Sequence, residues 1–455
     1  MARSSTGPGG PGSKAGVDSI SAEAFSRALD GCRVPSPFAL AVSGGPDSVT
    51  LMHLAARYAR SRNVAPPVVF TVDHRLRRES CDEAHAVKEQ AQALGLAHET
   101  LVWEGPKPRA NLQHAARVAR YSLIGEAMRR AGIWALLTGH TLDDQAETFL
   151  LRLARGSGLD GLSGMGQVAP FPMPMFSDLS VMRPMLGFSK QQVLATAREF
   201  DASFFNDPSN SDPAFARSRT RDAMSALASA GVTPERIAEA AAHLRRARSA
   251  IETAEREVFD RAVTLDPWGY ALADRAALTA APHEVGLRAV ASLLRLAGGN
   301  EYPPDLDTLS GVYEWLSMPM PRGRTAAGCR LALLSDGVVL AAREQAGLDL
   351  DEPVLMLSPG QTGIWDGRFR VGVSAQAPVG VYAVQALGAF AQSALKIPGF
   401  PPSRIEPRRI AATYPGLFQD GILAAVPVPP GPANGLFFAE FLGRAPLVFA
   451  APDWL

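Results

Sequence analysis

The sequence has few cysteines, and no two of them are close together. Cys32, Cys81 and Cys329 are the three cysteines among 455 residues. A disulfide framework or a cysteine-ligated zinc site requires paired or closely spaced cysteines, so the composition argues against both. A reducing compartment fits this usage, and we expect a cytoplasmic protein.

The chain also lacks an excess of charge and a long apolar run. Its 45 Lys and Arg residues balance 45 Asp and Glu residues. Net charge therefore does not indicate a nucleic-acid partner, although a local basic face would be enough to bind one. No apolar run approaches the roughly 20 residues of a membrane span, so we expect no membrane partner. Residues 1–17 are rich in Gly, Pro and Ser and lack an apolar signal core, which predicts a disordered tail over 1–20.

What the sequence does contain is a glycine loop between an apolar strand, 38–42, and a helical pattern that begins at Val49. Glycines allow the loop amides to converge beside the positive end of the helix, which favours an anion of phosphate type. No Gly-Lys-Ser/Thr follows, so this is not a Walker A loop. Asp47 would repel phosphate unless a cation lay between them, which implies Mg²⁺ bound by Asp47. A glycine turn with a capping Asp or Ser is the simpler alternative. The loop residues are Ser43, Gly44, Gly45, Pro46, Asp47 and Ser48.

Strands and helices alternate beyond this loop, which predicts a doubly wound parallel sheet in an α/β fold. Further strands are expected at 68–72, 97–103 and 133–138. Polar clusters at 43–48, 73–77 and 140–144 each follow a strand. Ligands of such sheets bind beyond the carboxyl ends of the strands, so these clusters predict one active site. The spacing of Ser80 with Glu83 and of Thr141 with Asp144 predicts two helix capping boxes.

The remaining chain predicts further domains. We expect a catalytic domain over 21–230, a helical linker and middle domain over 231–345, and a small mixed α+β C-terminal domain over 346–455. A stretch rich in Gly, Met and Pro, 156–174, indicates a mobile loop within the first of these.

Several charged residues are candidates for chemistry. His140, Asp143, Asp144 and Glu147 could hold Mg²⁺ or orient an amine nucleophile, and helix capping is the alternative for the acids. Arg117 and Arg120 are three residues apart and could neutralise phosphate together. Asp73 and Arg77 follow the second strand and are assigned to the nucleotide. Alternating arginines suit RNA phosphate contacts, and they occur here as Arg217, Arg219 and Arg221.

These motifs stand in one order along the chain, and together they resemble the bacterial tRNA(Ile)-lysidine synthetases, which are PP-loop ATP pyrophosphatases. The resemblance covers about 36–225. Relatives often have two histidines where this chain has Gly139-His140. The sequence after Pro427 resembles the family poorly. Weaker likeness continues at 328–331 and 365–368. The motifs that carry the resemblance are 43–48, 73–77, 111–121, 140–148, 152–159, 183–186 and 206–221.

The resemblance implies a reaction with ATP, Mg²⁺, L-lysine and tRNA(Ile) bearing a CAU anticodon. The wobble cytidine is adenylated, and lysine then displaces AMP to form lysidine. Catalytic roles are implied for Asp47, Arg120, His140 and Asp144, and a tRNA-binding role for the C-terminal domain. A homodimer stays open. The alternatives are a tRNA thiolase, which typically uses a cysteine pair or an iron–sulfur cluster, and a non-catalytic adenine-nucleotide-binding regulator. Contacts to lysine or tRNA are implied for Arg117, Asp143, Glu147, Arg217, Arg219 and Arg221.

Overall fold

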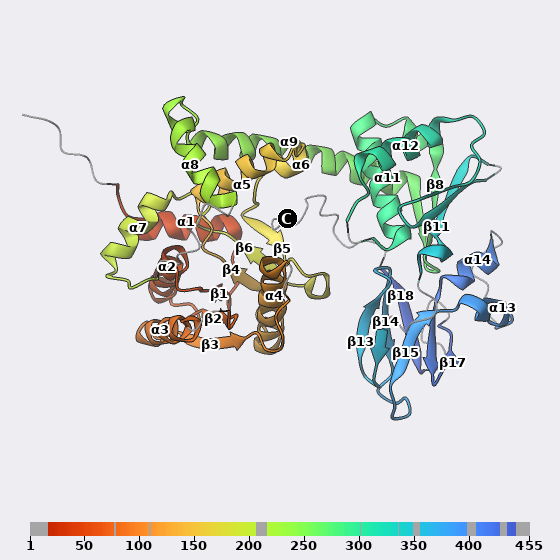
Figure 1. Cartoon of the computed structure of the whole chain (residues 1–455), viewed down its shortest axis with the longest axis horizontal. Helices are drawn as coiled ribbons and strands as arrows, with labels where there is room; N and C mark the ends of the chain where they lie inside the picture. The colour runs from red at the N-terminus through yellow and green to blue at the C-terminus, as the bar shows by residue number, and fades with distance from the viewer. Residues whose placement is uncertain are drawn as a thin grey trace, which may run out of the picture. The chain divides into compact units, whose positions relative to one another are not determined.

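A computed structural model of the chain describes residues 17–76, 79–108, 111–205, 216–300, 302–334, 336–348, 355–397, 406–427 and 435–442. Its internal contacts divide the chain into two compact units, Met1–Leu244 and Arg245–Leu455, and the division lies within the long helix α9 (Pro234–Ala262) (Figure 1). Within the described segments, no helix is both long enough and apolar enough to cross a bilayer.

A six-stranded sheet forms the centre of the first unit. Its order is β3-β2-β1-β4-β6-β5, and every described pair is parallel except β5 with β6. The predicted parallel α/β sheet is therefore confirmed, with an antiparallel edge strand added. The strands are β1 (Ala39–Ala41), β2 (Val68–Asp73), β3 (Ala97–Val102), β4 (Ala135–Leu137), β5 (Val168–Pro170) and β6 (Ser180–Met182).

Helices cover both faces of this sheet, as its alternating side chains require. Leu40 and Leu137 belong to a core with α1, α2 and α3, whereas Ala39 and Leu136 belong to a core with α4. Figure 1 shows α4 on the face opposite α2 and α3. The helices of this unit include α1 (Ala22–Cys32), α2 (Pro46–Arg62), α3 (Ser80–Ala93), α4 (Leu112–Ala131), α5 (Leu142–Ala154), α7 (Lys190–Glu199) and α8 (Ala216–Ser229).

The predicted mobile loop at 156–174 is instead a structured segment that contains α6 (Leu159–Leu162) and β5. Side chains from outside it bond its backbone. Arg152 Nη1 donates to the Gly161 carbonyl (2.9 Å), and Arg183 Nη1 donates to the Gly166 carbonyl (2.9 Å). The Gln145 amide donates to the Met165 carbonyl and accepts from the Met165 N–H, at 2.7 and 2.6 Å. The segment therefore contains regular structure that the loop prediction missed, because polar side chains from outside it satisfy part of its backbone.

The second unit begins with an antiparallel sheet of order β7-β8-β11-β10-β9. The expected helical middle domain therefore contains a five-stranded sheet, on which α11 packs through a shared core. The strands are β7 (Val263–Asp266), β8 (Tyr270–Asp274), β9 (Arg324–Ala326), β10 (Cys329–Leu333) and β11 (Val338–Arg343). The helices are α10 (Arg275–Thr279), α11 (His283–Gly298) and α12 (Leu306–Ser317).

The rest of the second unit is mixed α+β, as expected. It holds two small antiparallel sheets, β12-β15-β16-β17 and β13-β14-β18. The strands are β12 (Leu355–Leu357), β13 (Thr362–Trp365), β14 (Phe369–Val373), β15 (Tyr382–Ala386), β16 (Pro415–Gln419), β17 (Ile422–Ala425) and β18 (Phe437–Phe441). Two short helices, α13 (Ala391–Ala394) and α14 (Pro407–Ala412), accompany them.

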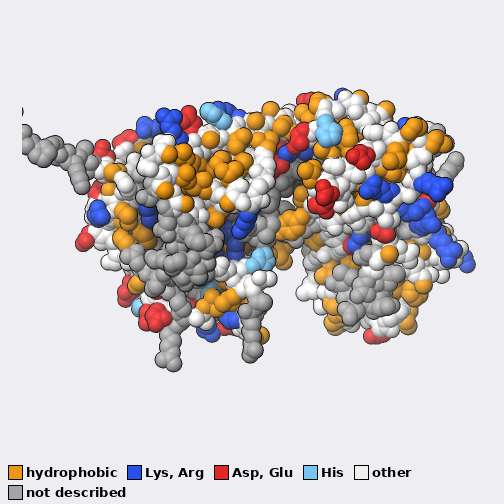
Figure 2. Space-filling model, turned by 45° about the horizontal axis from the view of Figure 1, so that its top comes forward, with side chains coloured by type: hydrophobic (Ala, Val, Ile, Leu, Met, Phe, Trp, Pro, Cys, Tyr) orange, Lys and Arg blue, Asp and Glu red, His pale blue; other side chains and the backbone are white. Residues whose placement is uncertain are grey.

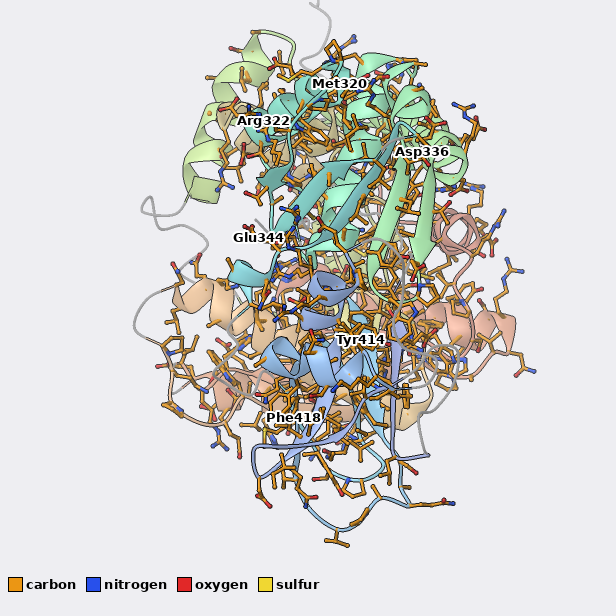
Figure 3. All side chains as sticks on the ribbon, turned by 90° about the vertical axis from the view of Figure 1, so that its right-hand side faces the viewer. Met320, Arg322, Asp336, Glu344, Tyr414 and Phe418 are labelled. Carbon is orange, nitrogen blue, oxygen red and sulfur yellow. The ribbon has the colours of Figure 1, made fainter. Side chains whose placement is uncertain are left out.

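A buried polar junction joins the two halves of the second unit. The guanidinium of Arg368, a residue only 2% exposed, donates to the Asp366 carboxylate (2.7 Å) and to the carbonyls of Gly269 (3.2 Å) and Thr413 (2.6 Å). The ring of Tyr414, labelled in Figure 3, packs against the ring of Trp268 with centroids 4.8 Å apart and planes tilted by 48°. Asp366 and Arg368 belong to 365–368, one of the two segments in which the sequence resembles the synthetase family more weakly. In the structure they help to connect the two halves of the second unit.

Candidate active site

The phosphate loop, Ser43–Ser48, lies between β1 and the N-terminus of α2. Ser48 organises it from within, because its Oγ accepts from the Ser43 N–H (3.1 Å) and donates to the Gly45 carbonyl (3.0 Å). α2 begins with Pro46, its N-cap is Gly45, and no side chain caps it. The first amides of α2 are therefore presented to the loop, where an anion is stabilised by the helix end.

Two glycines are required by geometry at this site. Gly44 has a φ of +87°, and a Cβ there would lie 3.1 Å from the Phe205 ring. Gly139 follows β4, and a Cβ there would lie 2.9 Å from the carbonyl carbon of Asp47 and 3.0 Å from the Ser48 nitrogen. The backbone after β4 thus lies directly against the start of α2. This contact brings two of the three predicted polar clusters together.

Three carboxylates and one lysine meet beside the phosphate loop; we call Asp47, Asp143 and Asp144 the carboxylate cluster. The Lys190 ammonium lies 2.5 and 2.6 Å from the two carboxylate oxygens of Asp47. Asp143 Oδ2 accepts from the Lys190 backbone N–H at 2.6 Å, at the first turn of α7. Asp143 therefore connects α5 to the helix that carries Lys190.

The surroundings of Asp47 act on the pKa of its carboxyl in opposite directions. Burial raises the pKa of the Asp47 carboxyl, the Lys190 charge opposes this by lowering that pKa, and the charges of Asp144 and Asp143 raise it further. The net effect is a raised pKa for the Asp47 carboxyl, and a cation beside Asp47 opposes that rise by favouring the charged carboxylate. Here that cation is Lys190.

Asp144 caps the N-terminus of α5, in addition to its predicted catalytic role. Its Oδ2 accepts from the Thr141 N–H (2.8 Å) and the Thr141 hydroxyl (2.9 Å), which confirms the predicted capping box. His140 Nδ1 lies 2.8 Å from the Thr138 hydroxyl. Glu147, one turn into α5, is only 5% exposed. The end of β4 and the start of α5 thus hold His140, Asp144 and Glu147 on one rigid segment.

A second group lies at the ends of β2 and β3, along the same edge of the sheet. Asp73 Oδ1 accepts from the Arg75 N–H (2.8 Å) and from the Ser80 hydroxyl (2.7 Å). The predicted Ser80–Glu83 capping box is therefore wrong. Glu79 is the N-cap of α3, and the Ser80 hydroxyl donates to the Asp73 carboxylate instead. Asp73 shapes the turn that follows β2.

His74 connects this turn to α4. Its Nε2 accepts from Arg120 Nη2 at 3.2 Å, and its ring meets the Trp103 ring edge-on at 5.9 Å. Burial and, after it, the charge of Arg120 lower the pKa of His74 to about 4. His74 is neutral near pH 7 and holds the guanidinium of Arg120, the predicted catalytic arginine.

The remaining predicted residues are placed only in part. Arg117 lies over the Tyr121 ring, 5.1 Å from its centroid. Arg77 lies outside the described residues, and so do the side chains of Arg217, Arg219 and Arg221, although their backbone belongs to α8.

Lys190 and His74 were missed by sequence reasoning. Lys190 is 143 residues from Asp47, and the only local signal was a lysine at the start of a predicted helix. His74 lies inside the predicted 73–77 cluster, but roles in that cluster were predicted only for Asp73 and Arg77.

The implied Mg²⁺ fits the donors at this site. In the part of the chain that the structure describes, no group of three or more His, Cys, Asp or Glu side chains is arranged to hold a metal ion. Mg²⁺ at a nucleotide site, however, needs one or two carboxylates and completes its shell with phosphates and water. The partly exposed Asp47 carboxylate meets that need, because a charged oxygen donor lies beside the phosphate loop.

The three cysteines are unpaired and differ in exposure. All three are free, Cys32 and Cys329 are buried and Cys81 is exposed. Burial raises the pKa of the Cys329 thiol to about 12, and its Sγ donates to the Leu294 carbonyl (3.1 Å). Cys329 is therefore a structural thiol.

Comparison with known proteins assigns the family. The model of the PP-loop domain family matches residues 18–227. The chain is 42% identical over 324 residues to a tRNA(Ile)-lysidine synthase of Methylobacterium nodulans, covering 70% of this chain and 92% of that protein. A tRNA(Ile)-lysidine synthase of Bradyrhizobium is 48% identical over 227 residues (48% and 62% coverage), and one of Anaplasma marginale is 32% identical over 344 residues (75% and 72%). This chain belongs to the tRNA(Ile)-lysidine synthase family.

Proposed function

We propose that this protein ligates L-lysine to C2 of the wobble cytidine in the CAU anticodon of tRNA(Ile), with ATP converted to AMP and pyrophosphate. The observation that carries the proposal is the uncapped N-terminus of α2 behind the phosphate loop, with Asp47 and Lys190 beside it, in a chain of the lysidine synthase family.

The first step is adenylation. The C2 oxygen of the cytidine attacks the α-phosphate of ATP, and pyrophosphate leaves toward the phosphate loop. Loop and helix amides stabilise the charge that develops on the leaving group, because they are fixed before the reaction begins. Arg120, held by His74 at 3.2 Å, adds a further positive charge at this edge of the sheet. Bound Mg²⁺, with Asp47 as its ligand, would neutralise phosphate charge.

The second step requires an amine nucleophile. The ε-amine of lysine attacks C2, and AMP leaves with the electrons of the C2–O bond. Lysine has an ordinary pKa near 10.4, so its ammonium must lose a proton before it attacks. The carboxylate cluster attracts the ammonium, and His140 or Asp144 accepts the proton. Glu147 and Asp143 stay candidates for holding the lysine.

Recognition of tRNA is assigned to basic side chains outside the phosphate loop. Arg117, Arg217, Arg219 and Arg221 are proposed as contacts in the catalytic domain, 21–230. The C-terminal domain, 346–455, is proposed to bind tRNA as well; α14 exposes Arg408 and Arg409, and Figure 2 shows Lys and Arg side chains gathered at one edge of the second unit. We place the reaction in the cytoplasm, and a homodimer is compatible with it.

One experiment tests the proposal. The protein is incubated with ATP, Mg²⁺, labelled lysine and total bacterial tRNA, and the tRNA is then digested to nucleosides. We expect label in lysidine, together with AMP and pyrophosphate that form only when tRNA is present. A parallel incubation replaces lysine with a sulfide donor: a thiolated nucleoside there, with no lysidine in the first incubation, would identify a thiolase. ATP binding without product in either incubation would identify a regulator.

A further inference from the structure

The phosphate loop has no lysine of its own. Its six residues, Ser43–Ser48, include one charged side chain, the acidic Asp47. Phosphate loops commonly use a lysine to meet the phosphates. A polyphosphate that enters this loop would face a carboxylate, so a cation from elsewhere in the fold is required.

Lys190 supplies a cation at this place. α7 begins with Lys190, and a capping box fixes this helix start: Gln192 Oε1 accepts from the Ser189 N–H (3.0 Å), and Ser189 Oγ accepts from the Gln192 N–H (3.3 Å). Asp143 holds the Lys190 backbone N–H as well. The base of the side chain is therefore rigid, while its four-carbon stem can turn.

The ammonium is positioned to change partners. An ammonium has three N–H donors, and Asp47 takes two of them. The Lys190 and Asp47 side chains are 36% and 29% exposed, so a ligand that enters the loop can reach both. The Lys190–Asp47 pair is thus open to exchange.

We propose that Lys190 is a phosphate-binding residue of the active site, which pairs with Asp47 in the free protein and contacts the β- and γ-phosphates of a bound nucleoside triphosphate. Asp47 is then released to meet the cation that accompanies the nucleotide. The inference rests on the proposed function, because it names the residue that receives the pyrophosphate leaving group. Lys190 takes the role that a lysine within the loop takes in Walker-type sites.

The test is equilibrium binding of labelled ATP and of inorganic pyrophosphate to the full-length protein, first without added magnesium. Lys190→Met should weaken both affinities by about 10- to 100-fold, the effect of one charged hydrogen bond. Lys190→Arg should restore most of the loss. Lys88→Met is the matched control, because Lys88 is exposed on α3, and it should leave both affinities unchanged. Thermal melts confirm folding.

Asp47→Asn separates a direct role of Lys190 from a purely structural one. It weakens the ion pair but keeps the lysine, so ATP affinity without magnesium should hold or rise. Equal losses in Asp47→Asn and Lys190→Met would overturn the inference, as would ATP binding by Lys190→Met within twofold of the wild type. If the wild type forms lysidine, these results reject the inference alone. Failure of the wild type to bind ATP would overturn the proposed function too.

Discussion

At the residue scale, the Asp47 carboxylate has little influence on stability. It lies in the first turn of α2, is partly exposed, and contacts Lys190. An exposed ion pair contributes at most about 1 kcal/mol to the free energy of unfolding. The proposed reaction, by contrast, uses the Asp47 charge beside the phosphates.

Asp47→Ala should therefore abolish adenylation and leave the fold intact. We expect tRNA-dependent pyrophosphate release to fall at least about 100-fold, the usual cost of losing one group that stabilises transition-state charge. The melting temperature should stay within about 4 °C of the wild type. Pyrophosphate release near the wild-type rate in the folded variant would disprove the assignment of Asp47 to the metal.

His74 predicts a pH dependence of stability. The folded protein lowers the pKa of His74 from 6.5 to about 4, so the unfolded chain binds this proton more tightly. Above pH 6.5 both states are neutral and His74 contributes nothing to the pH dependence. As the pH falls from 6.5 toward 4, the proton favours unfolding, and stability declines.

His74→Gln should reduce this decline. The measurement is urea unfolding at pH 7, 6 and 5 for the wild type, His74→Gln and a control, His85→Gln. His85 is exposed on α3, so its variant should follow the wild type. Parallel pH profiles for all three proteins would show that His74 is protonated equally in both states.

Motif residues could be predicted at this scale, and their partners could not. A strand followed by Gly44-Gly45 indicated the phosphate loop because the requirement is local. The contact of Lys190 with Asp47 depends on how α7 packs beside α2, and that of His74 with Arg120 on how α4 meets β2. No spacing in one sequence encodes either contact.

At the scale of elements, the approach of β4 to α2 is tight at Gly139. A Cβ there would meet backbone atoms of Asp47 and Ser48 at 2.9–3.0 Å. Backbone cannot turn away as a flexible side chain can, so overpacking should destabilise the protein by about 1–3 kcal/mol.

Gly139→Ala should therefore lower the melting temperature by several degrees and displace the phosphate loop. Gly187→Ala is the matched control, because a Cβ at Gly187 meets no atom within 4 Å. We expect reduced ATP affinity in Gly139→Ala and wild-type behaviour in Gly187→Ala. Equal melting temperatures for the two variants would show that the backbone shifts at little cost.

Regular elements could be predicted where the pattern was long. The helical linker expected from 231 onward contains α9, and the strand expected at 68–72 is β2. β5 and β6, three residues each, were missed because tertiary hydrogen bonds such as that from Arg183 fix the segment around them. β7 and β8 follow the long helix α9 directly, so their residues were assigned to the expected helical domain.

At the scale of the whole molecule, 45 basic residues balance 45 acidic ones, although Figure 2 shows Lys and Arg side chains gathered at one edge of the second unit. A tRNA must therefore bind through local groups of basic residues. Many such residues in the second unit already have partners: Arg330 pairs with Glu406 at 2.9 Å, and Arg343 pairs with Asp366 at 3.1 Å. These pairs belong to the junction of that unit, so they are poor candidates for RNA contacts.

The arginines of α8 are better candidates, and Arg217→Ala with Arg219→Ala should weaken tRNA binding. Each phosphate contact makes affinity fall with salt, and its loss flattens the log–log dependence by about one unit. Filter binding across a salt series measures this slope, and ATP affinity, measured in parallel, should be unchanged. Arg248→Ala is the control, because Arg248 pairs with Glu252 at 2.7 Å on α9. A wild-type slope in the double variant would assign these arginines to the fold, and tRNA contacts would then be sought at exposed residues of the second unit such as Arg408.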